Sequence, residues 1–117
     1  MPNGEGRARR TEPHTPVMLD EVLEWLRVKP DGTYVDATLG AGGHSAAIAQ
    51  KLTSGRLISL DRDAQALELA RERLKIFGEK VTLAPAPFSR IAEVVHELGI
   101  PGVDGVLADL GVSSMQL

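Results

Sequence analysis

The chain has 117 residues, of which 43% are apolar and 25% charged, as is typical of one small globular domain with a modest core. Its formal net charge of -3 argues against an autonomous nucleic-acid-binding protein, because phosphate neutralisation needs a surplus of Lys and Arg. The chain lacks cysteine, which excludes a disulfide framework, and no apolar run approaches the roughly 20 residues of a membrane span. The basic N-terminus has no apolar core after it, so it is not a secretory signal, and we expect a cytoplasmic protein.

The chain begins with a polar stretch that contains Gly and Pro. We expect residues 1–13 to form a flexible tail and residues 14–117 to form the folded part. Thr15 and Pro16 predict a helix start, because threonine caps helices and proline suits the first turn. Apolar residues then recur on one helical face, at Leu19, Val22, Leu23 and Leu26.

Four short apolar runs follow the turn at residues 29–32 and alternate with helical segments. We predict buried strands at 33–37, 56–61, 81–84 and 103–110. The helices between them are predicted from about His44 to Leu52, from a cap at Asp63 to about Phe77, and from a cap at Ser89 to Leu98, with Gly78 and Gly99 ending the last two. This alternation predicts an α/β fold with a parallel sheet covered by helices.

The fourth predicted strand raises the question of what covers it. A doubly wound sheet with its switch point at the first strand would have the order 3-2-1-4 and leave the fourth strand at an edge. An apolar edge invites aggregation, so we expect a larger fold of which this chain is the first part, truncated after the fourth strand, or a partner surface. A homodimer would cover the strand, although no residue indicates one.

The loop after the first strand carries a cluster of glycines, at the place where open α/β sheets bind nucleotides. Gly40 and Gly42 begin the pattern G-x-G-x-x-G, but Ser45 stands where its third glycine belongs, and the G-K-[ST] of a P-loop is missing. Asp61 follows Gly40 by 21 positions and ends the second strand, where a carboxylate can accept both hydroxyls of an adenosine ribose. Asp36, inside the first strand, is less expected of a dinucleotide fold. Together these features indicate S-adenosylmethionine, which carries no pyrophosphate.

Plainer interpretations of the same residues stay open at this point. A glycine cluster is often just a tight turn, and a lone His44 in a first helical turn is more often a capping group than a catalyst. Phe88 is either a core residue, which the general behaviour of aromatics favours, or a ring that stacks on a purine. Asp109 ends the fourth strand, but the two prolines that often follow this position in amine methyltransferases are missing. Three scattered histidines do not make a metal site.

Five segments together resemble the bacterial 16S ribosomal RNA cytosine-N4 methyltransferases of the MraW type. They are HTPVMLDEV, KPDGTYVDATLGAGGHS, LDRDAQALELA, PFS and DGVLADLGVSSMQL, and they extend from His14 to Leu117. The pieces GAGGHS and DLGVSS-x-QL are highly specific in combination. The chain departs mildly from the family at Ala37, where glycine is frequent, and more strongly in length. Family members continue with an inserted helical domain and the remaining strands.

The resemblance implies a Rossmann-like class I methyltransferase fold, of which residues 14–117 are the N-terminal part. It also implies a pocket for S-adenosylmethionine and changes the preferred role of Phe88 from core residue to adenine contact. By this analogy the cofactor contacts are Gly42, Gly43 and His44 at the methionine end, Asp61 at the ribose, Phe88 at the adenine, and Asp109 and Gln116 completing the pocket.

The implied reaction is methylation of the N4 amine of a cytidine in 16S rRNA of the small ribosomal subunit. The sulfonium makes the methyl group electrophilic, so the protein's work is alignment. Asp109 is the candidate that orients the amine and accepts its proton, and the cytosine must leave its stack to reach the pocket. For the chain alone we expect weak cofactor binding and little or no catalysis.

Two alternative interpretations of the chain's function belong to other classes of protein. The chain could be a catalytically incompetent fragment. It could also be a dinucleotide-binding oxidoreductase domain, which Ser45 in the place of the third glycine and the DLGVSS match disfavour.

Overall fold

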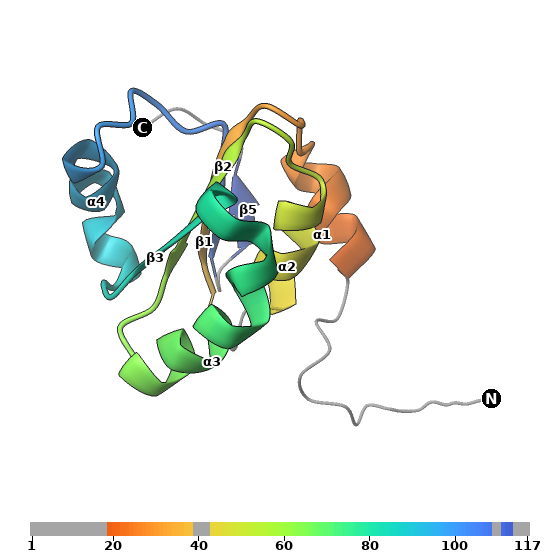
Figure 1. Ribbon diagram of the computed structural model, residues 1–117. Helices are drawn as coiled ribbons and strands as arrows, with labels where there is room; N and C mark the ends of the chain where they lie inside the picture. The colour runs from red at the N-terminus through yellow and green to blue at the C-terminus, as the bar shows by residue number, and fades with distance from the viewer. Residues whose placement is uncertain (1–18, 39–42, 109–110, 114–117) are drawn as a thin grey trace.

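The computed structural model describes residues 19–38, 43–108 and 111–113, in which helices and strands alternate as predicted (Figure 1). The predicted flexible tail and the predicted cap at Thr15 lie outside these residues. In chain order the elements are α1 (Leu19–Leu26), β1 (Thr33–Ala37), α2 (Gly43–Gln50), β2 (Arg56–Leu60), α3 (Ala64–Leu74), the 3₁₀-helical turn η2 (Lys75–Lys80), β3 (Val81–Ala84), the 3₁₀-helical turn η3 (Phe88–Arg90), α4 (Ile91–Glu97), β4 (Gly105–Ala108) and β5 (Gly111–Ser113).

The strands form one sheet in the order β3-β2-β1-β4-β5. The predicted order 3-2-1-4 and the parallel pairing of these four strands are confirmed. The expectation that the fourth strand is an edge is wrong, because β5 pairs with β4 in the antiparallel direction, with Val106 opposite Ser113. The sequence predicts one continuous strand from 103 to 110, whereas the structure has two strands, β4 and β5. A two-residue connection is enough to reverse an antiparallel pair, and so short a reversal has little sequence signal.

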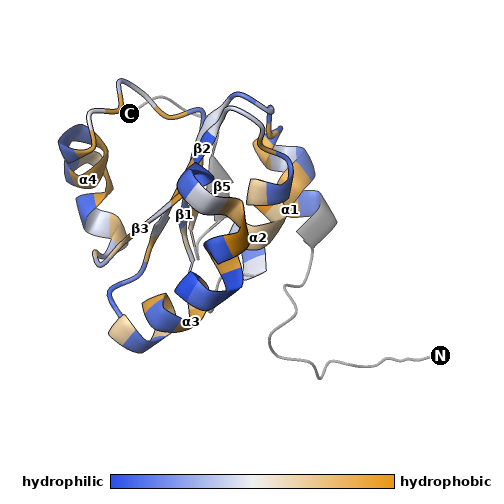
Figure 2. Cartoon of the chain, in the orientation of Figure 1, coloured by the Kyte–Doolittle hydropathy of each residue, from blue (hydrophilic) through white to orange (hydrophobic). Residues whose placement is uncertain are grey.

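The helices cover the sheet on both faces, with α1, α2 and α3 on one side and α4 on the other (Figure 1). Side chains alternate along each strand and so divide the apolar residues into two clusters. Figure 2 shows that the helices that cover the sheet carry both hydrophobic and hydrophilic residues. Tyr34 and Leu57 pack with α1 and α2, whereas Val35 and Ile58 pack with α4. Because helices cover both faces of the sheet, side chains on both sides of β1 and β2 are buried. The sequences of these two strands are therefore mostly apolar, as expected of parallel strands.

The helix ends agree only in part with prediction. Asp63 caps α3 as predicted, since its Oδ1 accepts a hydrogen bond of 2.9 Å from the Gln65 backbone N–H. The predicted cap at Ser89 is wrong: residues 88–90 form the turn η3, so Ser89 lies inside a turn, and no side chain caps α4. The helix α3 is shorter than predicted and ends at Leu74, after which η2 carries the chain to the positive φ of Gly78.

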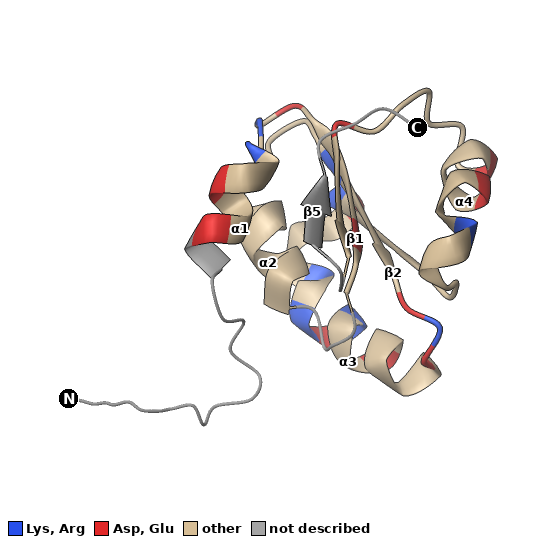
Figure 3. Cartoon of the chain, turned by 180° about the vertical axis from the view of Figure 1, so that it is seen from behind, with Lys and Arg blue, Asp and Glu red and all other residues tan. Residues whose placement is uncertain are grey.

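Most charged side chains of the described residues lie on the helices and turns (Figure 3). None of the described helices is long and apolar enough to cross a membrane.

Candidate functional site

A cavity of about 320 Å³ lies at the carboxyl end of the sheet. Parallel strands end at the same edge, so the last residue of β1, the residues after β2 and the connection from β3 to α4 meet there. Its size is in the range of small-molecule sites. Its lining residues are Ala37, Leu60, Asp61, Arg62, Ala86, Pro87, Phe88 and Ser89, which include two of the predicted contacts.

Asp61 is the buried acid of this cavity, with 7% of its surface exposed. Its Oδ1 accepts a hydrogen bond of 2.9 Å from the Asp63 backbone N–H. Its Oδ2 is buried and has no hydrogen-bond partner among the described residues. A buried polar atom without a partner costs about 1–3 kcal/mol, and more if it is charged. A ligand that donates a hydroxyl proton to Oδ2 would remove this cost, and a ribose is such a donor.

Phe88 lies in η3 and also lines the cavity. The interpretation of this residue as core packing is wrong, because 47% of its surface is exposed. An apolar ring at the rim of a cavity is suited to stack on a planar base. Arg90, two residues on, forms a double hydrogen bond with Glu93, at 2.8 Å and 2.9 Å, which joins η3 to the first turn of α4. That ion pair lowers the pKa of the Glu93 carboxyl.

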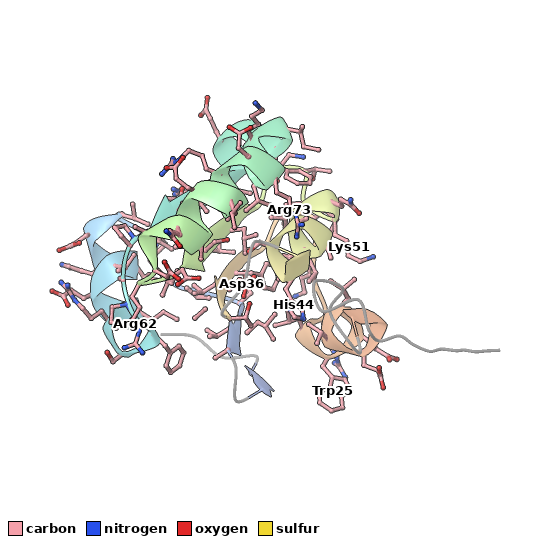
Figure 4. All side chains as sticks on the ribbon, turned by 90° about the horizontal axis from the view of Figure 1, so that it is seen from below. Trp25, Asp36, His44, Lys51, Arg62 and Arg73 are labelled. Atoms are coloured by element: carbon pink, nitrogen blue, oxygen red, sulfur yellow. The ribbon has the colours of Figure 1, made fainter. Side chains whose placement is uncertain are left out.

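The predicted methionine-side residues lie elsewhere on the same sheet edge. Gly43 and His44 open α2, and both are half-buried. In Figure 4, Asp36 lies between His44 on one side and Arg62 on the other. The predicted contacts Gly42, Asp109 and Gln116 lie outside the described residues, so their roles stay predictions.

A buried polar network next to this site was missed from the sequence. The Oδ1 of Asp36 accepts hydrogen bonds from the Thr38 backbone N–H at 3.0 Å and the Thr38 hydroxyl at 2.7 Å, and its Oδ2 accepts one from the Ser45 hydroxyl at 2.6 Å. The Ser45 and Ser59 hydroxyls are also 2.6 Å apart. Asp36 and Ser59 are partners in the β1–β2 register, so both face α2. The signal that could have revealed the network is an aspartate in the interior of the strand TYVDA and a serine in the interior of the strand RLISL.

The network and Asp61 are neighbours. Both line a second cavity of about 20 Å³, comparable with the space that one water molecule needs. The buried polar groups of β1, α2 and β2 therefore form one continuous region at the carboxyl end of the sheet.

Residues 11–117 match the MraW methylase family. The chain belongs to this family. It is 53% identical over 105 residues to the ribosomal RNA small subunit methyltransferase H of Brevibacillus brevis, a match of 89% of this chain and 33% of that protein. It is 54% identical over 106 residues to the protein of the same name from Heliobacterium modesticaldum, a match of 89% and 34%. This MraW chain thus spans about a third of the length of the curated relatives it matches.

Solved structures agree with this membership at the level of the fold. A precorrin-6y C5,15-methyltransferase from Geobacter metallireducens is 26% identical, with a TM-score of 0.64 over 77% of this chain and 46% of that one. A SAM-dependent O-methyltransferase from Thermotoga maritima is 24% identical, with a TM-score of 0.58 over 64% and 29%. The predicted Rossmann-like fold of S-adenosylmethionine-dependent methyltransferases is confirmed.

Proposed function

We propose that this MraW chain forms the S-adenosylmethionine-binding part of an enzyme that methylates the N4 amine of a cytidine in 16S rRNA. The observation that carries the proposal is Asp61, a buried acid whose Oδ2 is unpaired among the described residues, in the lining of a cavity large enough for a nucleoside. The names of the relatives, which are ribosomal RNA small subunit methyltransferases, support the RNA substrate. The small ribosomal subunit is then the partner, and the cytoplasm is the compartment.

The described residues suit the adenosine half of the cofactor. Asp61 would accept hydrogen bonds from the ribose, and Phe88 would pack against the adenine. Gly43 and His44 would line the methionine end. When bound, the cofactor supplies a methyl group made electrophilic by the neighbouring sulfonium. The chain's own residues bind and orient it, so that the reacting atoms meet in line.

Two further assignments belong to the proposal. Asp109 would orient the cytosine amine and accept its proton, and Gln116 would complete the pocket. Residues 14–117 would be the N-terminal part of the cofactor-binding domain, with the inserted helical domain and the remaining strands contributed by further chain. We therefore expect weak cofactor binding at best, and little or no catalysis, from the 117-residue chain on its own.

The test compares Asp61→Ala with the unsubstituted chain by NMR titration, which measures weak binding. We expect S-adenosylhomocysteine to bind Asp61→Ala at least tenfold more weakly, because the ribose loses a charged acceptor worth about 1.5–3 kcal/mol. The unsubstituted chain should prefer adenosine to 2′,3′-dideoxyadenosine, and the variant should lose that preference. Asp31→Ala removes the same charge from the turn before β1 and is the matched control.

Equal affinity of the variant and the unsubstituted chain for S-adenosylhomocysteine would contradict the proposal. Tighter binding of NADH than of S-adenosylhomocysteine would instead favour the dinucleotide-binding alternative.

A further inference from the structure

Ser45 is the most deeply buried of the polar residues in the described core, with 1% of its surface exposed. It is the third residue of α2, and its hydroxyl has two short contacts, to Asp36 and to Ser59. A dinucleotide fold has a glycine at this position, which allows close packing of helix on strand. In this chain the position is Ser45, whose hydroxyl forms hydrogen bonds in defined directions.

The donors in this network follow from counting protons. An ionised carboxylate can only accept, and a serine hydroxyl has a single proton to give. Ser45 donates that proton to the Oδ2 of Asp36. Ser59 must therefore be the donor in its contact with Ser45. The hydrogen bonds run in one direction, from β2 through α2 to the carboxylate of β1.

This arrangement fixes the start of α2 against the sheet. Asp36 accepts from Thr38, directly after β1, as well as from Ser45. The Asp36 carboxylate is thus hydrogen-bonded both to the residue that follows β1 and to the first turn of α2. Gly43 and His44 immediately precede Ser45, so their position depends on the same hydrogen bond.

We propose that Ser45 is a positioning residue for the cofactor: its hydrogen bond to Asp36 holds Gly43 and His44 where the methionine end binds. The inference rests on the proposed function. It concerns one end of the ligand only, since the adenosine end would contact Asp61 and Phe88, and the hydrogen bonds of the Ser45 hydroxyl go to Asp36 and Ser59 instead.

The test compares two ligands on one variant. Ser45→Ala should weaken S-adenosylhomocysteine binding by roughly tenfold, the effect of about 1.4 kcal/mol. The same variant should bind adenosine, which lacks the methionine end, within about twofold of the unsubstituted chain. A merely structural role of Ser45 would not separate the two ligands, because loss of folded protein weakens both equally. Thr53→Ala removes an exposed hydroxyl just beyond the other end of α2 and should change neither affinity.

Thr38→Val provides a second variant in case Ser45→Ala does not fold. It removes the hydroxyl that donates to Asp36 but keeps the shape of the half-buried side chain. We expect the same selective weakening, of about fivefold. Equal weakening of both ligands, or no weakening, would overturn the role of Ser45 and leave the proposed function standing. If the unsubstituted chain bound neither ligand, the proposed function would fail, and the positioning role with it.

Discussion

Tyr34 joins the end of α1 to the first strand. Its ring is 1% exposed, and its hydroxyl accepts a hydrogen bond from the Lys29 backbone N–H at 2.8 Å and donates to the Arg27 carbonyl at 3.3 Å. Arg27 has a left-handed backbone with φ of 52°, which costs energy for a residue with a side chain. Burial raises the pKa of the Tyr34 hydroxyl. The charges of Asp104 and Asp31 add to this, and the Lys29 N–H opposes it.

Tyr34→Phe should lower the free energy of unfolding by about 1 kcal/mol at pH 8, because the Lys29 N–H and the Arg27 carbonyl each lose a partner. A raised pKa means that the folded chain keeps this proton more tightly than the unfolded chain. The protonated Tyr34 hydroxyl therefore stabilises the folded chain fully below pH 10, the ordinary pKa of tyrosine. This stabilisation is lost as the pH rises through the folded-state pKa. Between pH 8 and pH 11.5, urea unfolding should show a larger loss of stability for the unsubstituted chain than for Tyr34→Phe. Equal losses would contradict the prediction.

Two buried carboxylates at neighbouring strand ends show what the sequence can predict at this scale. The spacing of Asp61 to the glycine loop predicts a ribose contact, and that role stays a prediction. For Asp36 the sequence predicts no role. Its hydrogen bonds depend on the register that places Asp36 opposite Ser59 and on the close approach of Ser45. Register is a tertiary property, so no local pattern distinguishes the satisfied oxygens of Asp36 from the unpaired Oδ2 of Asp61.

At the scale of elements, the sequence predicts a capping residue before each of the helices α3 and α4, but only the cap of α3 forms. Asp63 has extended backbone angles and accepts from the first turn of α3. Ser89 was an equally good cap by composition, but a proline precedes Phe88, and the chain enters a tight turn before α4. The capping signal in a sequence is therefore conditional on the backbone of the residues before it.

Asp63→Ala should lower the free energy of unfolding by about 0.5–2 kcal/mol, because the Gln65 N–H loses its acceptor. Ser89→Ala should change it by less than about 0.5 kcal/mol, since Ser89 is exposed and caps no helix. Chemical denaturation of the two variants measures both values. A loss for Ser89→Ala as large as that for Asp63→Ala would show that the predicted cap exists after all.

The strands were the easiest elements to predict. Those at 33–37 and 81–84 have the predicted bounds, because each is a short, mostly apolar run between turn signals, of strand length. The strand β4 is shorter than predicted and β5 was missed. The run from 103 to 110 reads as one strand, and the reversal needs only two residues.

At the scale of the whole molecule, a single sheet separates two apolar layers. Adjacent residues of β2 belong to different layers: Leu57 packs with α1 and α2, and Ile58 packs with α4. Both are fully buried, and both belong to one strand, which pairs with β1 on one side and with β3 on the other. Because the layers share the sheet, neither can lose its packing alone.

Leu57→Ala and Ile58→Ala should therefore destabilise the chain by similar amounts, about 2–5 kcal/mol each. The loss should be detected equally by probes in either layer, with coincident unfolding curves from circular dichroism and from NMR signals of α1 and α4. Ile76→Ala, at a residue that is 80% exposed, should stay within about 0.5 kcal/mol of the unsubstituted chain. Separate transitions for the two layers would contradict the prediction.

The strand order also determines when each part of the sheet can form during synthesis. The central strand β1 is made first, and β2 and β3 extend the sheet to one side. The other side of β1 stays unpaired until β4 is made, and Asp104, directly before β4, contacts Thr33 from 71 residues further along the chain. At 5–20 residues per second a ribosome needs on the order of ten seconds to bridge that distance. For that time the nascent chain exposes an apolar strand edge at what will become the centre of the sheet. Protection from aggregation then has to come from outside the sheet.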